Sequence, residues 1–140
     1  MSTDLIEVPA VKATEEPSIA NQLAHCTGSE NHYCHPLRRH FRFTDGVKLL
    51  AELAKAYWLI DVAMSHQCKM NVRIEPFQLW SIRRLPKTAR NMAVVECRRD
   101  SGCKALCRQY LSYTDFPFDD LGDTYEWYVE NQVMMLKSER

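Results

Sequence analysis

The stretch TDGVKLLAELAKAYWLIDVAMSHQ, residues 44–67, decides most of the fold. Thr44 is a typical helix N-cap, and apolar residues then recur at the spacing of one buried helical face. From residue 56 to residue 64 the stretch is apolar on every side except for Asp61, and a helix of that kind belongs inside a domain. We therefore predict that this segment is the central core element, with a bend near Ala56 that can divide it into two helices.

The segments before this stretch are expected to be shorter or less regular. Pro17 and Ser18 suit the first turn of a short helix over residues 19–25, which should end near Gly28. Residues 29–43 are rich in Arg and His and show no helical or strand period. We expect them to form a loop with at most one helical turn.

The pattern becomes strand-like after Pro76, where aromatic and β-favouring residues replace the helical spacing. Three strands are predicted at residues 77–84, 92–99 and 104–113. The last two should form a hairpin, because a turn signal separates them. A loop is expected over residues 114–122.

The last segment alternates between two faces and predicts a second hairpin that turns at Asn131-Gln132. A C-terminal helix is the alternative for the same residues. Because helices come first and strands afterwards, we predict an α+β fold. Its N-terminal helices should pack on one face of an antiparallel sheet of about four to five strands.

The domain organisation follows from length and composition. Residues 1–16 are acidic and without a clear period, so we expect a flexible arm ahead of a single α+β domain over residues 17–140. No apolar run approaches the roughly 20 residues that cross a bilayer, and the first residues lack the apolar stretch of a signal peptide. A cytoplasmic protein with reduced cysteines and no membrane contact is expected.

The net charge of zero hides an asymmetry along the chain. Residues 31–108 hold 15 Lys/Arg against 6 Asp/Glu, a net of +9, and the remainder holds 3 against 12, a net of −9. The split predicts two charged binding surfaces, with ordinary pairing between the two sets as the alternative. The predicted acidic face consists of Asp115, Asp119, Asp120, Asp123 and Glu126. The predicted basic edge consists of Arg38, Arg39, Arg42, Arg83, Arg84, Arg98 and Arg99.

Histidine and cysteine crowd residues 25–40, and both are zinc ligands. Their spacing is not that of a zinc finger, so a zinc-binding module built on this cluster is an alternative function and no metal site is predicted. The members of the cluster are His25, Cys26, His32, Cys34, His35 and His40.

His35 and His66 near a carboxylate could perform general acid–base catalysis, so a metal-independent hydrolase or nuclease is a second alternative. Ser65 and His66 are adjacent, and on a helix their side chains point about 100° apart, which prevents a nucleophile–base pair. Asp61 lies four residues from both Tyr57 and Ser65, which we expect to be its hydrogen-bond partners. The four glycines are isolated, so no phosphate-binding loop is predicted. No cofactor and no catalytic residue is predicted either.

Eight phrases, in order, carry a resemblance to a known family. They are TGSEN at 27–31, YCH at 33–35, TDGVK at 44–48, AYWLID at 56–61, SHQ at 65–67, FQLW at 77–80, YTDFP at 113–117 and EN at 130–131. With these phrases the chain resembles the uncharacterised bacterial DUF6876-type family over about residues 21–139. The resemblance implies no activity, and its members look like small proteins of bacterial and mobile-element genomes.

Two departures from the family pattern bear on the fold. The family tends to have glycine at the position of Lys55, which supports a break near Ala56. It tends to have Asn-Gly at the position of Asn131-Gln132, which supports a hairpin turn there.

These observations together favour a small non-enzymatic protein that binds a macromolecule, either a protein or a protein–nucleic-acid complex. Direct nucleic-acid binding is less favoured, because the sequence pI is about 6.9. The context of the family suggests an accessory protein of a mobile element, or an inhibitor of a host defence complex of the CRISPR type (an anti-CRISPR).

Overall fold

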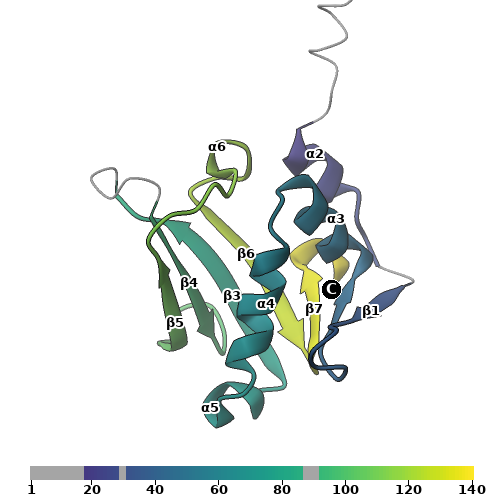
Figure 1. Cartoon of the computed structure of the whole chain (residues 1–140), viewed down its shortest axis with the longest axis vertical. Helices are drawn as coiled ribbons and strands as arrows, with labels where there is room; N and C mark the ends of the chain where they lie inside the picture. Colours follow the sequence, from purple (N-terminus) through teal and green to yellow (C-terminus); the bar gives the residue numbers. More distant parts are fainter. Residues whose placement is uncertain (1–17, 29–30, 87–91) are drawn as a thin grey trace, which may run out of the picture.

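Seven strands form one sheet, and helices lie over it (Figure 1). The computed structural model describes residues 18–28, 31–86 and 92–140, so the predicted arm over residues 1–16 lies outside the described residues. Among those residues the α-helices are α2 (Ile19–Ala24), α3 (Asp45–Leu53), α4 (Tyr57–His66), α5 (Met70–Arg73) and α6 (Phe118–Leu121). The strands are β1 (His32–Cys34), β2 (Arg42–Thr44), β3 (Phe77–Arg84), β4 (Ala93–Arg98), β5 (Ala105–Leu111), β6 (Thr124–Glu130) and β7 (Val133–Leu136), followed by the 3-10 turn η2 (Lys137–Glu139).

The strand order across the sheet is β1-β2-β7-β6-β3-β4-β5. Neighbouring strands are antiparallel except for β2 and β7, which are parallel. The mixed α and β character is confirmed, but the sheet has more strands than the four to five predicted. The two additional strands, β1 and β2, lie at residues 32–34 and 42–44, so the prediction of a loop over residues 29–43 was wrong where these strands form. Strands of three residues are too short to display an alternating pattern.

The predicted break between two helices is confirmed. α3 ends at Leu53, α4 begins at Tyr57, and Lys55 between them has a φ of 54°. Only glycine adopts that left-handed region without a steric cost. The left-handed φ explains why a glycine suits this position. Lysine adopts the same conformation here because the packed helices on either side hold the backbone in place.

Replacing the exposed Lys55 by glycine is expected to stabilise the protein by about 0.5–1 kcal/mol, because the left-handed conformation then loses its clash with Cβ. Thermal unfolding followed by circular dichroism should show a rise of a few degrees in Tm. Lys55→Ala is the matched control, since it removes the same charge but keeps Cβ. An equal rise in both variants would show that charge, and not backbone conformation, is responsible.

The C-terminal segment is a hairpin, as predicted, and not a helix. β6 and β7 pair antiparallel, and the two residues between them, Asn131 and Gln132, have φ values of 53° and 66°. Two successive left-handed residues are the mark of the hairpin turn in which Asn-Gly is the favoured pair. This turn directs β7 back along β6, where it also meets β2.

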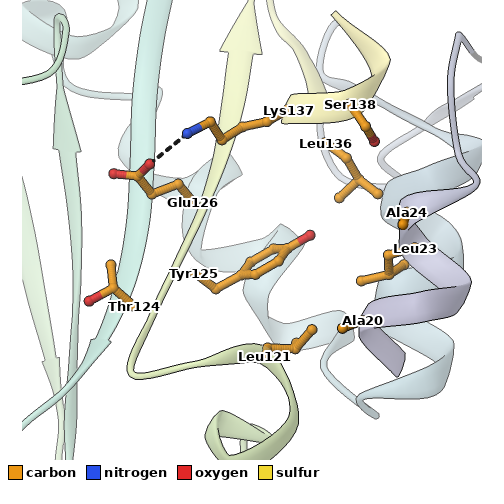
Figure 2. A pocket seen from close by; sticks show the side chains of 10 residues that line it. All are labelled: Ala20, Leu23, Ala24, Leu121, Thr124, Tyr125, Glu126, Leu136, Lys137 and Ser138. Carbon is orange, nitrogen blue, oxygen red and sulfur yellow. Dashed lines mark hydrogen bonds and ion pairs between the residues drawn. The ribbon is translucent and has the colours of Figure 1, made fainter. Parts of the chain in front are cut away.

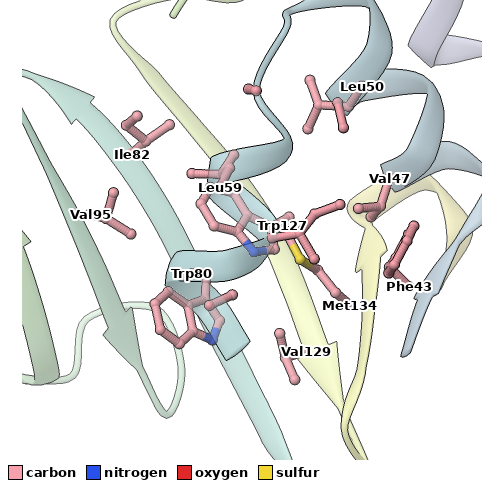
Figure 3. Close-up of a cluster of buried hydrophobic side chains, with 14 of the residues drawn as sticks. Phe43, Val47, Leu50, Leu59, Trp80, Ile82, Val95, Trp127, Val129 and Met134 are labelled. Atoms are coloured by element: carbon pink, nitrogen blue, oxygen red, sulfur yellow. The ribbon is translucent and has the colours of Figure 1, made fainter. Parts of the chain in front are cut away.

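The hydrophobic core lies between α4 and the centre of the sheet (Figure 3). Leu59 of α4, Trp80 of β3 and Trp127 of β6 are fully buried, and the two indole rings stack with their centroids 6.3 Å apart. Full burial of one large apolar side chain contributes about 1.5–3 kcal/mol. The prediction that residues 44–67 supply the central core element is confirmed, and α3 adds Val47 and Leu50.

Candidate functional site

The two faces of the sheet carry different side chains. Side chains alternate between the faces along each strand. Trp80 points to the face where α4 lies, because its ring contacts His66 of that helix. Leu79, Ser81 and Arg83 of the same strand therefore point to the opposite face, which we call the far face.

An arginine cluster, defined as Arg83, Arg98 and Arg108, surrounds Glu96 on the far face. Glu96 is in register with Ser81 of β3 and with Arg108 of β5, which places all these side chains on one face. Arg98 donates to Glu96 Oε1 at 3.1 Å, Arg108 donates to Oε2 at 2.9 Å, and Arg83 Nη2 lies 3.7 Å from Oε1. The Glu96 side chain is only 4% exposed, whereas those of the arginines are 46%, 27% and 48% exposed in chain order.

Glu96 stays ionised because of its partners. Burial by itself raises the pKa of this carboxyl group, but the hydrogen bond from Arg98 and the charges of Arg98, Arg83 and Arg108 outweigh it and hold the pKa below its usual range. One negative and three positive charges leave a net of +2 at this point of the surface. The far face therefore presents a fixed, half-exposed positive patch.

The structure distributes the predicted basic edge over several places. Arg83 and Arg98 belong to the arginine cluster, but Arg84 pairs with Asp119 and Asp123, and Arg99 pairs with Glu75. Arg39 and Arg42 are exposed, and Arg38 lies within 3.7 Å of the Cys68 sulfur.

Sequence reasoning missed Glu96 and Arg108 as members of the site. The available signal was the alternation in the predicted hairpin, because Glu96 and Arg98 are two residues apart on one strand. A third charged residue, Arg108, lies on the strand opposite.

Four residues of the predicted acidic face already hold structural partners. Asp120 accepts hydrogen bonds from the backbone N–H groups of Ile19, at 2.8 Å, and Ala20, at 3.3 Å, and so caps α2. Glu126 pairs with Lys137 at 2.8 Å. Asp119 accepts a hydrogen bond from Arg84 at 3.0 Å, and Asp123 lies 3.6 Å from the same guanidinium group.

Asp115, Asp119 and Asp123 are exposed. Asp115 and Asp119 line a surface groove of about 540 Å³, together with Tyr113 and Arg84. The groove lies beside α6, so the acidic residues 115–123 gather around that helix. Glu126 lies apart from them, on β6.

His35 and Asp61 form a pair across a large sequence separation. His35 Nε2 and Asp61 Oδ1 are 2.7 Å apart, and His35 Nδ1 accepts the backbone N–H of Leu37 at 3.0 Å. The expectation that Tyr57 and Ser65 are the partners of Asp61 was wrong. Tyr57 donates to Glu52 and Ser65 donates to the Val62 carbonyl instead.

The Asp61 side chain is 66% exposed, so the core helix carries its acid on the outer side. The imidazole of His35, by contrast, is buried, and both of its nitrogens are engaged. The pair ties the loop before β2 to α4.

His66, at the end of α4, is buried and contacts residues other than His35 and Asp61. Its Nε2 is 2.8 Å from Gln109 Oε1, and its ring packs on Trp80. Nδ1 of His66 has no hydrogen-bond partner among the described residues. The two histidines of the catalytic alternative thus make contacts with different partners, Asp61 and Gln109.

The predicted His/Cys cluster does not gather into one site. His35 is buried, whereas His25, His32, His40 and Cys34 are exposed. In the part of the chain that the structure describes, no three His, Cys, Asp or Glu side chains are arranged to hold a metal ion.

Residues 17–140 match the model of a family described as a family of unknown function, DUF6876. The chain belongs to the DUF6876 family. The resemblance seen in the sequence is thereby confirmed over residues 17–140. No curated protein and no solved structure matches it. Membership of the DUF6876 family therefore assigns no activity to the protein, and its surface features are the guide to its function.

A second hollow of this DUF6876 protein lies between α2 and the β6–β7 hairpin (Figure 2). Its volume is about 590 Å³, and Leu23, Leu136 and Tyr125 are among the apolar residues that line it. The Tyr125 hydroxyl points into the hollow (Figure 2), and burial raises the pKa of this phenol to about 12. The hydroxyl therefore stays protonated at physiological pH and can only act as a neutral hydrogen-bonding group.

None of the described helices combines the length and the apolar character that a membrane span requires.

Proposed function

We propose that this DUF6876 protein is non-enzymatic and acts by binding an anionic surface of a protein or of a protein–nucleic-acid complex. The observation that carries the proposal is the arginine cluster around Glu96. A carboxylate held by three guanidinium groups fixes their positions before a partner arrives, which lowers the entropy cost of binding.

The donors of the cluster far exceed the acceptors that the protein supplies. Three guanidinium groups carry about fifteen N–H donors, and one carboxylate accepts roughly four hydrogen bonds. Arg98 also donates to the Cys103 carbonyl at 3.0 Å. The arginine side chains are partly exposed, so a partner's carboxylate or phosphate groups can accept hydrogen bonds from the remaining donors in pairs.

The surroundings of the cluster suit a macromolecular interface. Tyr110 is 62% exposed and, two residues from Arg108 on β5, lies on the same face. Tyrosine and arginine are the residues enriched in protein interfaces. We also infer that the helices cover only the face where α4 lies, as expected from the sequence, so that the far face stays free for a partner.

The histidines support a non-enzymatic role. Both nitrogens of His35 are engaged, by Asp61 and by Leu37, so its lone pair is already used. A general base needs a free lone pair within reach of a substrate proton. His66 is buried against Trp80 and Gln109.

Neutralising the cluster is expected to weaken binding of the natural partner at least tenfold, which corresponds to about 1.4 kcal/mol. The partner would be captured with the tagged full-length protein and identified by mass spectrometry. Binding of the purified partner to Arg83→Gln/Arg108→Gln would then be compared with that of the parent protein at low and high salt. The loss of affinity should be larger at low salt, because at high salt the ions already screen the attraction between exposed charges in the parent complex.

Arg39→Gln/Arg99→Gln is the matched control, since it removes two exposed arginines that lie outside the cluster. Equal weakening by both double variants would show that overall charge, and not this site, drives binding. If Arg83→Gln/Arg108→Gln binds the partner with unchanged affinity at an unchanged Tm, the arginine cluster is not the binding site.

The acidic face is tested separately by Asp119→Lys/Asp123→Lys. Asp120 should be left intact, because its loss would remove two hydrogen bonds to the start of α2 and confuse binding with stability. Direct nucleic-acid binding is tested by titrating a labelled single-stranded oligonucleotide with the purified protein alone. Saturable, salt-sensitive binding of the oligonucleotide that depends on Arg83 and Arg108 would show that the cluster binds a nucleic acid directly, and the proposal of a protein partner would be wrong.

The narrower setting, in which a mobile-element protein inhibits a CRISPR-type defence complex, remains a prediction. Identification of the captured partner tests it directly. A partner with no role in nucleic-acid handling would contradict it and leave the binding proposal standing.

A further inference from the structure

Two free cysteines face each other across the hairpin of β4 and β5. Cys97 and Cys107 are direct register partners, and neither is in a disulfide in the structure. Directly opposed residues of antiparallel strands have Cα atoms about 4.5–5.5 Å apart. Disulfides form at Cα separations of about 4.4–6.8 Å, so the backbone already has a spacing that a bridge accepts.

The two thiols have different surroundings. Cys97 is fully buried, with its sulfur 3.9 Å from Gln78 Oε1, and Cys107 is partly exposed. The interaction with the neighbouring Cys107 thiol, helped by burial, raises the pKa of Cys97. The same interaction lowers the pKa of Cys107, and the Lys69 ammonium group lowers it further against the opposing effect of burial. Cys107 is therefore the nucleophile of the pair, and Cys97 is the resolving thiol.

We propose that Cys97 and Cys107 are a redox modification site that closes to a reversible disulfide when a low-molecular-weight disulfide is the oxidant. The Cys107 thiolate attacks one sulfur of the oxidant, which forms a mixed disulfide and releases one small thiolate. Cys97 then loses its proton and attacks the Cys107 sulfur, which releases the second small thiolate. Two protein thiols are oxidised to one disulfide, and one small disulfide is reduced to two thiols.

The bridge would join β4 to β5, which is an edge strand of the sheet. These strands carry Arg98 and Arg108 on the opposite face, next in sequence to the two cysteines. The inference does not depend on the proposed function, because closure of the disulfide is measured on the protein alone.

The test uses the full-length protein with oxidised glutathione as the probe. After incubation, free thiols are blocked with N-ethylmaleimide and the chain is digested with trypsin. The expected product is the peptide NMAVVECR, residues 91–98, joined by a disulfide to ALCR, residues 105–108. This joined peptide should disappear after treatment with dithiothreitol. Cys103→Ser is the control, since this exposed neighbour in the turn is not needed and the same joined peptide should form.

Oxidation should also raise Tm by on the order of 5 °C in the parent protein, because the bridge constrains the unfolded chain. In Cys107→Ser, a substitution at the partly exposed position that should fold, the rise should vanish. Joined peptides that contain Cys103 in place of Cys97 or Cys107 would overturn the proposal. Glutathione found on Cys107 without closure to Cys97 would overturn it as well.

Discussion

Replacing Gln78 by leucine is expected to lower the free energy of unfolding by about 3 kcal/mol, because several buried polar groups lose their partner at once. Gln78 Oε1 accepts from the Trp80 indole and from the Gln67 amide, both at 2.9 Å. Gln78 Nε2 donates to Gln67 Oε1 at 3.0 Å and to the Val72 carbonyl at 2.9 Å. Leucine fills a similar volume, so the loss reports on hydrogen bonds and not on a cavity.

Urea unfolding followed by tryptophan fluorescence measures this loss. Gln132→Ala is the control, since Gln132 reaches the same network from the β6–β7 turn through a single bond to Gln67 at 2.8 Å. It should cost only about 1 kcal/mol. A loss below 1 kcal/mol for Gln78→Leu would mean that the freed groups find other partners, and the network would not be needed for stability.

The second large effect concerns Gly46 at the start of α3. The Glu139 carboxylate accepts from the Gly46 backbone N–H at 3.0 Å, from the Thr44 hydroxyl at 2.6 Å and from the Leu136 N–H at 2.9 Å. A Cβ on Gly46 would lie 2.5–2.7 Å from three atoms of this carboxylate. Gly46→Ala is therefore expected to push Glu139 away and to cost about 2 kcal/mol through the lost hydrogen bonds and the lost negative charge at the helix start.

A double-mutant cycle separates this mechanism from ordinary helix propensity. Glu139→Ala alone should cost a similar amount, and adding Gly46→Ala to it should cost nothing further, since the carboxylate is gone. The interaction energy would then be about 2 kcal/mol. Additive losses in urea unfolding would contradict the contact as the cause and would assign the effect of Gly46 to its backbone.

Local sequence signals were sufficient for some parts of the fold. The break at Lys55 and the turn at Asn131-Gln132 are set by the conformation of one or two residues. The helix spacing of residues 44–67 and the alternation after Pro76 reveal the core and five of the strands. Each of these features depends on residues close together in the chain.

The remainder depends on contacts between distant residues. Asp61 meets His35 and not its helical neighbours, and Asp120 caps a helix that begins at Ile19. The arginine cluster needed the register of β4 against β5 to place Arg108 beside Glu96. No pattern within one element carries that information, so these pairings became visible only in the folded chain.

The parallel pairing of β2 with β7 has a consequence for synthesis of the protein. β2 and β1 join the sheet only through β7, and Glu139, just after β7, completes the cap of α3. β1, β2 and the start of α3 therefore cannot complete these contacts until residues 133–139 have been synthesised, although structure usually forms from the N-terminus onward during translation. During that interval the apolar side of α3 lacks the strand it packs on. The nascent chain is thus a candidate for chaperone capture, which a folded copy would escape.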